Sequence, residues 1–220
     1  MDGRELTGAV VAVVGATGGL GREIVAVLTG RDATVVRAGR TGGIDVMVDL
    51  RDSRAGDGLV EYCTSTHGRL DGVIVAAGIV AFGDLVDTDD VVMEELFLTN
   101  TLGPMWLAKR VAAALRESQG FFVNISGVVA ESPMPGMAAY SASKAGAAAA
   151  MESIQREFRR TKVQGVDARP PHTETGLATR PLAGVAPTMP EGLAPRAVAE
   201  RIVVAVERKE AVVTSTEFSS

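Results

Sequence analysis

The feature that most constrains this chain of 220 residues is the alternation of short apolar runs with segments of helical spacing. The first run, "GAVVAVVG" (8–15), is β-branched and ends at glycine, as expected of a strand buried on both faces. Further strands are predicted at 33–40, 45–50, 70–78, 120–126, 162–168 and 211–218. Helices are predicted between them, at 19–30, 88–100 (with Thr88 as N-cap), 103–118, 137–160 and 195–210, with a polar helical stretch after residue 50. This order predicts an α/β fold, a doubly wound parallel sheet of about seven strands with helices on both faces.

Composition narrows the class of protein. The length suits one sizeable core, and no repeat or linker divides the chain, so we expect a single domain over 1–220. A Pro/Gly-rich stretch at 169–195 is long for a connection and is expected to be a functional loop. A net charge of −5 with mixed signs argues against nucleic acid as a partner. The single cysteine, Cys63, excludes an intrachain disulfide and fits a cytoplasmic location, and no apolar stretch predicts a signal peptide or a membrane span.

A glycine loop follows the first predicted strand. In "VVGATGGLGREI", Gly15 suits a tight turn, Gly19 a close approach of backbone to a diphosphate, and Gly21 close packing of helix on sheet. The free N–H groups of the helix that follows attract an anion. The alternative is a glycine-rich turn that serves packing alone, but its place between the first strand and the first helix favours dinucleotide binding.

The second predicted strand bears on the choice of dinucleotide. It ends in "VVRAGRTGG", without the acid that usually accepts the hydroxyls of an adenosine ribose. Arg37 and Arg40 are present instead, and arginine suits a 2′-phosphate, which favours NADP while leaving NAD possible. Arg40 is the better candidate because it lies just past the strand. Asp49 is a candidate for the adenine amino group, or else an ordinary solvated aspartate.

Tyr140 and Lys144 stand four residues apart in an alanine-rich helix, so they share one face. A nearby ammonium lowers the pKa of a phenol and lets it exchange a proton with a carbonyl or alcohol oxygen. A half-buried tyrosine beside an ordinary lysine is the alternative for such a pair taken alone.

Three motifs in order point to one family. The glycine loop, "LTNTLGPMWLAKR" and "YSASK" together make the chain from about residue 8 to 213 resemble the short-chain dehydrogenase/reductase family. The resemblance implies a Rossmann-type sheet and hydride transfer to or from a nicotinamide. It also implies that Tyr140 is the acid/base, that Lys144 binds the nicotinamide ribose, and that Asn100 holds a water of the proton relay. Read without the family, Asn100 is a local cap at a helix junction.

The same resemblance suggests how the chain would hold its cofactor. "RPPHTETGL" (169–177) matches the segment that reaches the nicotinamide carboxamide, with Thr175 as the contacting hydroxyl and Pro170–Pro171 where the family has Pro-Gly. His172 is a second acid/base candidate, or else a solvated or structural loop residue. The expected cofactor-binding residues are Gly15, Thr17, Gly19, Leu20, Gly21, Arg40, Asp49, Leu50, Ala76, Ala77, Gly78, Tyr140, Lys144, Pro170 and Thr175.

Two departures from the family pattern matter. "VAAG" (75–78) retains only the end of the usual Asn-Asn-Ala-Gly. The family serine stands thirteen residues before the tyrosine, a position held here by Gly127, and Ser126 comes one residue earlier. Because successive strand side chains face opposite ways, the hydroxyl needs a bulge or an extra loop residue to reach the substrate. We expect a bulge or an extra loop residue to bring Ser126 back to the site, with its Oγ near the Tyr140 hydroxyl. Ser132 is a weaker substitute.

These residues leave the substrate undefined beyond a small hydrophobic carbonyl or alcohol compound. The expected lining is Val128, Met134, Met137 and 177–182, and the segment 177–195, which is short for a substrate-binding loop, suggests an open or shallow site. A homodimer or homotetramer is expected from the resemblance, through the alanine-rich helix and Met105, Trp106 and Leu107, although these residues also suit a monomer core. Two other functions remain open: a cofactor-binding sensor of the same fold whose chemistry has lapsed, and an epimerase or dehydratase of the broader family.

Overall fold

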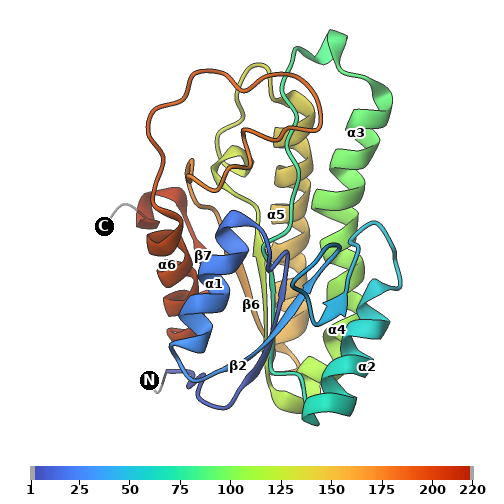
Figure 1. The fold of residues 1–220 in the computed structure, drawn as a ribbon, viewed down its shortest axis with the longest axis vertical. Helices are drawn as coiled ribbons and strands as arrows, with labels where there is room; N and C mark the ends of the chain where they lie inside the picture. Colours follow the sequence, from blue (N-terminus) through green and yellow to red (C-terminus); the bar gives the residue numbers. More distant parts are fainter. Residues whose placement is uncertain (1–2, 219–220) are drawn as a thin grey trace.

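The computed structural model describes residues 3–218 and contains a seven-stranded, wholly parallel sheet of order β3-β2-β1-β4-β5-β6-β7 (Figure 1). The predicted doubly wound sheet is therefore confirmed. Its strands are β1 Val10–Val14, β2 Thr34–Gly39, β3 Val46–Met47, β4 Gly72–Val75, β5 Phe121–Ile125, β6 Gln164–Ala168 and β7 Val212–Val213.

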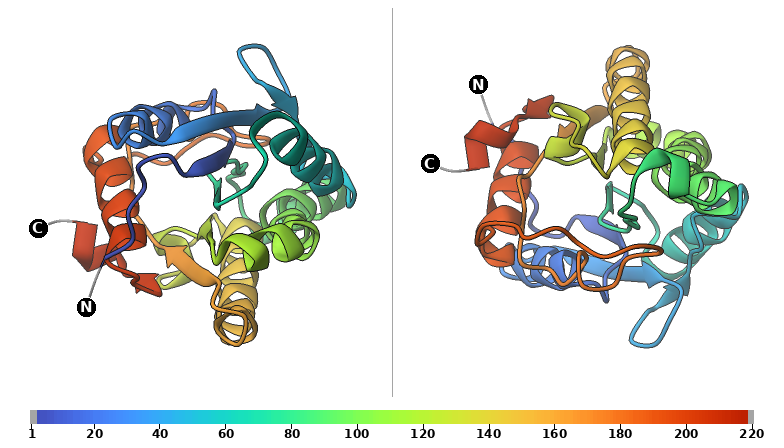
Figure 2. Two further views of the ribbon diagram at one scale, coloured as in Figure 1. Left: turned by 90° about the horizontal axis from the view of Figure 1, so that it is seen from below. Right: turned by 90° about the horizontal axis from the view of Figure 1, so that it is seen from above.

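Helices cover both faces of this sheet (Figure 2). Side chains alternate along β1: Val11 and Val13 face α1 and α6, whereas Val10, Ala12 and Val14 face α2 and α4. The helix α5 lies along the second face, beside β6. The helices are α1 Gly19–Thr29, α2 Ala55–His67, α3 Asp90–Phe97, α4 Gly103–Ser118, α5 Ala138–Arg159 and α6 Pro195–Glu207.

The largest local departure from the sequence prediction lies between α3 and α4. A π-helical turn, Leu98–Leu102, joins the two helices without a break. The N-cap of α3 is Asp89, whose carboxylate accepts from Val91 N at 2.9 Å, whereas the Thr88 hydroxyl donates to Asp84 O. The prediction of Thr88 as the cap was wrong because the helix begins one residue later.

The segment between β6 and α6 arches over the carboxyl ends of the strands (Figure 1). A bridge between Thr173 and Leu193 closes it at its base. Its middle pairs with the chain that follows β4, where Leu182 N donates to Val80 O at 2.7 Å and Phe82 N to Ala183 O at 2.9 Å. These bonds hold the loop down over the strand ends.

The surface proposed for self-association is only partly available. Met105 is 40% exposed and Trp106 is half-buried, but Leu107 is 2% exposed and belongs to the core. Within residues 3–218, no helix combines the length and the apolar character that a membrane span requires.

Candidate active site

The glycine loop lies at the carboxyl end of β1. Gly15 adopts φ +87°, and a Cβ there would lie 2.6 Å from Ala77 N, so only glycine fits. The helix α1 begins at Gly19 after an N-cap, Gly18, that offers no side chain to the first amides. Those amides are thus available to an anion. A Cβ on Gly19 would collide with the Thr175 carbonyl, so the structure brings the loop after β6 onto the predicted phosphate site.

Two arginines near the end of β2 differ in what they contact. Arg37 pairs with Asp45 at 3.0 Å, and this hydrogen bond holds the pKa of the Asp45 carboxyl below its ordinary value. Arg40 is exposed just past the strand and forms no ion pair within residues 3–218. Asp49, expected near adenine, accepts from Arg51 at 2.7 Å, and chiefly this bond lowers the pKa of its carboxyl.

Asn100 lies within the π-helical turn and is 2% exposed. Its Oδ1 accepts from Ile79 N at 3.0 Å, and its Nδ2 donates to Ile79 O at 2.9 Å and to Ser143 Oγ at 3.1 Å. The amide therefore joins the chain after β4 to α5. It does not act as a local helix cap, which was the alternative from sequence.

Lys144 reaches the same place from α5. Its Nζ donates to Ile125 O, at the end of β5, at 2.7 Å. A Cβ on Gly78 would lie 3.4 Å from Lys144 Nζ and 3.3 Å from Asn100 Oδ1. Three predicted site residues thus converge beside the carboxyl end of β4, and glycine at position 78 leaves room for the two side chains.

Tyr140 lies one turn before Lys144 on α5 and is 9% exposed. Burial raises the pKa of Tyr140 to about 12 and lowers the pKa of Lys144 to about 8. We expected Lys144 to lower the pKa of Tyr140, and the structure contradicts this, because desolvation of the phenol dominates. The ring packs in an apolar cluster of Val80, Ala81, Phe82, Leu96, Val129, Met137 and, from the loop, Leu177, Ala178, Ala183 and Ala186.

Ser126 points into the interior of the protein. It is fully buried, and its hydroxyl has no hydrogen-bond partner within the described residues, so it forms no hydrogen bond with the Tyr140 hydroxyl. Burial raises the pKa of the Asp167 carboxyl, and the Ser126 hydroxyl only opposes that rise. The family position also supplies no hydroxyl: Gly127 has φ +81°, a conformation in which a serine is strained. Ser132 is exposed in the loop before α5.

The remaining loop candidates are held by neighbours in the loop. His172 Nε2 lies 3.2 Å from Glu174 Oε1, which also accepts from Gly192 N at 2.8 Å. This contact favours the structural alternative for His172 over an acid/base role. A pocket of about 550 Å³ opens among residues 172–191. Met134, an expected lining residue, is 47% exposed.

Sequence reasoning missed two residues that contribute to the site. Ser143 links Asn100 to α5, and its Oγ also donates to Tyr140 O at 2.7 Å. It stands inside "YSASK", so its place in the motif was a signal. Asp167, 1% exposed on β6, was visible as an acid within an apolar strand.

Comparisons with known proteins agree with this arrangement. A family model described as short chain dehydrogenase matches residues 9–183. Dehydrogenase/reductase SDR family member 7B of Bos taurus is 29% identical over 232 residues, which cover 92% of this chain and 71% of the relative. Versicolorin reductase 1 of Aspergillus parasiticus is 30% identical over 160 residues, covering 65% of this chain and 61% of that protein.

Solved structures share the fold at lower identity. A short chain dehydrogenase from Burkholderia cenocepacia in complex with NADP has a TM-score of 0.83 at 21% identity, covering 98% of this chain and 92% of the other. A short chain dehydrogenase/reductase from Burkholderia phymatum in complex with NAD has a TM-score of 0.85 at 19% identity, covering 96% and 90%. The arrangement of sheet and helices is therefore common to all three.

Proposed function

Because the chain belongs to the short-chain dehydrogenase/reductase family, we propose that it transfers hydride between NADP(H) and the carbonyl or secondary alcohol group of a small hydrophobic compound. The observation that carries the proposal is the convergence of Asn100 and Lys144 beside Gly78, one helical turn from Tyr140. Side chains from α5 and from the α3–α4 junction meet there at the carboxyl ends of the strands, where ligands of open α/β sheets bind.

The residues present fit a dinucleotide. Gly15 and Gly19 leave the backbone bare at the start of α1, so its amides suit the diphosphate. Ala77 and Gly78 follow β4 as a close-packed wall without bulky side chains, and Thr175 reaches the glycine loop from the other side. Lys144 would hold the nicotinamide ribose. When bound, the nicotinamide supplies or accepts the hydride, and the chain supplies the proton.

Tyr140 is the proton donor in this proposal. Its pKa of about 12 means that the phenol carries its proton throughout the neutral range, as a donor to a carbonyl oxygen must. The Lys144 ammonium favours the phenolate left behind. The interior orientation of Ser126 leaves Tyr140 as the hydroxyl that we assign to the substrate oxygen, and the apolar cluster around its ring favours a hydrophobic substrate.

The preference for NADP rests on Arg40. Arg37 is already paired with Asp45, so Arg40 is the cation left for a 2′-phosphate. We expect Arg40→Ala to weaken NADPH binding about tenfold and to leave NADH binding nearly unchanged, as measured by cofactor fluorescence. Arg37→Ala is the matched control and should change neither. Equal losses of both cofactors in Arg40→Ala would count against the preference.

The activity is tested by NADPH oxidation over a panel of ketones, aldehydes and quinones. Tyr140→Phe should retain cofactor binding and lose about 10²- to 10⁴-fold in turnover, the usual range for a lost acid/base. Turnover that survives in Tyr140→Phe would refute the assigned role.

One observation favours a second candidate, a cofactor-binding sensor without turnover. The hydroxyl of Ser126 faces the core, and Gly127 holds the family serine position. Tight NADPH binding with no oxidation across the whole panel would support the sensor over the enzyme.

We also propose that α4 and α5 pair with a second copy of the chain. Leu102 and Met105 are each 40% exposed, and Phe97, at the end of α3, is 39% exposed. Exposed apolar side chains that follow one another in a helical segment favour burial against a partner.

A further inference from the structure

A buried acid lies beneath the helix that carries Lys144. The side chains of Val166 and Ala168 on β6 face the α1/α6 layer, so Asp167 between them faces α5. Asp167 is paired in register with Asn124 of β5, so Asn124 faces the same way, as does Ser126 two residues on. Three buried polar side chains therefore line the sheet under α5.

This polar group is not fully satisfied. Asp167 Oδ2 accepts from Arg169 Nε at 2.8 Å, but Asp167 Oδ1 has no hydrogen-bond partner among residues 3–218. The same holds for Ser126 Oγ and Asn124 Nδ2. Unpaired buried polar atoms are costly, and those that persist in native proteins often serve a function. Stability alone therefore does not account for an acid at this position.

The charge that Asp167 faces on α5 is the Lys144 ammonium. Each group favours the charged form of the other: the carboxylate opposes the burial that lowers the pKa of Lys144, and the ammonium opposes the burial that raises the pKa of Asp167. The other titratable or charged neighbours are Tyr140 on α5, Arg169 after β6, and Glu131 after β5, which lies 3.4 Å from Arg169.

We infer, resting on the function proposed for Tyr140 and Lys144, that Asp167 is a positioning residue. Its carboxylate, fixed by Arg169, keeps the Lys144 ammonium charged and directed to the end of β5. Asp167 thereby sets the upper pH limit of activity, because Lys144 supports Tyr140 and the ribose only while it is protonated.

The test is a titration of Lys144 in the cofactor-free protein, followed by NMR of ¹³C-labelled lysine side chains. The chain has four lysines, and Lys144→Arg identifies the signal. Asp167→Asn retains an acceptor for Arg169 but removes the charge. We expect it to move the Lys144 titration to lower pH by about one unit or more, and to move the alkaline fall of NADPH oxidation by the same amount.

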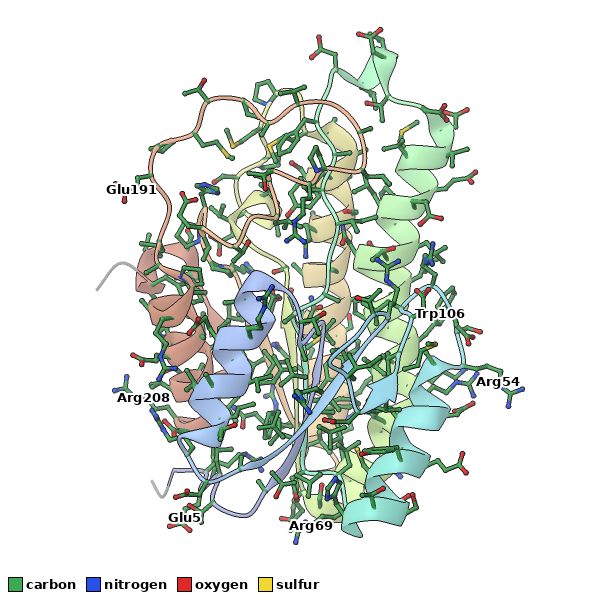
Figure 3. All side chains as sticks on the ribbon, in the orientation of Figure 1. Glu5, Arg54, Arg69, Trp106, Glu191 and Arg208 are labelled. Atoms are coloured by element: carbon green, nitrogen blue, oxygen red, sulfur yellow. The ribbon has the colours of Figure 1, made fainter. Side chains whose placement is uncertain are left out.

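Asp71→Asn is the matched control. Asp71 is 5% exposed and pairs with Arg69, two residues away, as Asp167 pairs with Arg169. It precedes β4 at the other end of the sheet, and Figure 3 shows Arg69 at the end of the molecule remote from Glu191 of the loop. Asp71→Asn should leave the Lys144 titration in place, even if it lowers the melting temperature.

Arg169→Gln provides a prediction of opposite sign. It removes a cation near Lys144 while leaving the carboxylate, so the titration should move to higher pH. If Asp167→Asn does not fold, Asp167→Ser, which also lacks the charge, takes its place in the titration. The inference is overturned if Asp167→Asn shifts the titration no more than Asp71→Asn, or if Arg169→Gln does not raise it. A shifted titration in a protein without turnover would instead overturn the proposed function.

Discussion

Lys144 holds its charge in a nearly closed environment, 7% exposed, with a hydrogen bond to the Ile125 carbonyl. Burial brings its pKa from 10.5 to about 8. At a pH between these two pKa values, Lys144 is protonated in the unfolded chain but has released its proton in the folded chain. The stability of the folded protein therefore rises with pH across this window, as far as Lys144 is concerned, and the full penalty for burying the charge applies below pH 8.

This linkage predicts how Lys144→Met differs from the parent protein. We expect the free energy of unfolding of the parent, minus that of Lys144→Met, to increase by about 2 kcal/mol between pH 7 and pH 10. Urea denaturation followed by circular dichroism at four pH values measures the difference. Lys109→Met, at an exposed position of α4, is the control. A difference that stays constant with pH would contradict the buried charge.

Ser126 tests whether the site uses a serine hydroxyl at all. Because its Oγ has no partner in the described chain, Ser126→Ala removes an unsatisfied group. We expect turnover within about threefold of the parent and an unchanged or slightly higher melting temperature. Steady-state NADPH oxidation beside Tyr140→Phe gives the comparison. A loss of turnover as large as that of Tyr140→Phe would show that the Ser126 hydroxyl contacts the substrate after all.

The contrast between these residues shows what the sequence was able to predict. The Tyr140–Lys144 pair was readable because the i, i+4 rule is local to one helix. The direction of Ser126 was not, since it depends on the torsion of Gly127 and on the end of β6, where Ser126 N and Gly127 N both donate to Ala168 O. The partnership of Asp167 with Lys144 joins a strand to a helix and exists only in the folded chain.

Among the elements, the loop between β6 and α6 depends on one glycine to pack against the chain that follows β4. Gly184 has φ +74°, and a Cβ there would collide with the Phe82 carbonyl. Close backbone approach at this point lets Phe82 N reach Ala183 O. The cover over Tyr140 is therefore held by backbone contacts that tolerate no side chain.

Gly184→Ala should lift this loop without unfolding the sheet. We expect faster cleavage within 172–193 in limited proteolysis and a roughly tenfold fall in kcat/KM, with little change in melting temperature, since loops open at low free-energy cost. Gly8→Ala is matched to it, with φ +72° and no atom within 4 Å of the new Cβ, and should affect neither reading. Equal proteolysis of the two variants would refute the role of Gly184 in holding the loop against Phe82.

Element boundaries were predicted less well than element types. The seven strands and the main helices came from periodicity and glycine stops, but β3 and β7 are each two residues long, shorter than the apolar runs at 45–50 and 211–218. The π-helical turn had no sequence signal, yet it carries Asn100. Such turns depend on packing from both sides, here on Ile79 and Ser143, which no window of local sequence contains.

At the scale of the whole molecule, the exposed apolar side chains at the start of α4 and in the turn before it predict self-association. We expect light scattering after size exclusion to give a dimer or tetramer, and Met105→Glu to shift the mass toward the monomer, because a charge is costly at a buried apolar interface. Val86→Glu, at a 91% exposed site before α3, is the control and should leave the mass unchanged. A monomeric parent protein would refute the proposed pairing.

The bridge between Thr173 and Leu193 has a consequence for how such a chain diversifies. Leu193 N donates to His172 O and Glu174 N to Leu193 O, so the two ends of the loop are tied together as in a sheet. With its ends fixed, a doubling of the loop adds only about 0.6 kcal/mol of closure entropy. Away from Thr175 and from the backbone contacts of residues 182–184, mutation and insertion within this loop are therefore tolerated by the sheet beneath. Evolution is free to alter which compounds enter while the proton donor and its lysine stay in place.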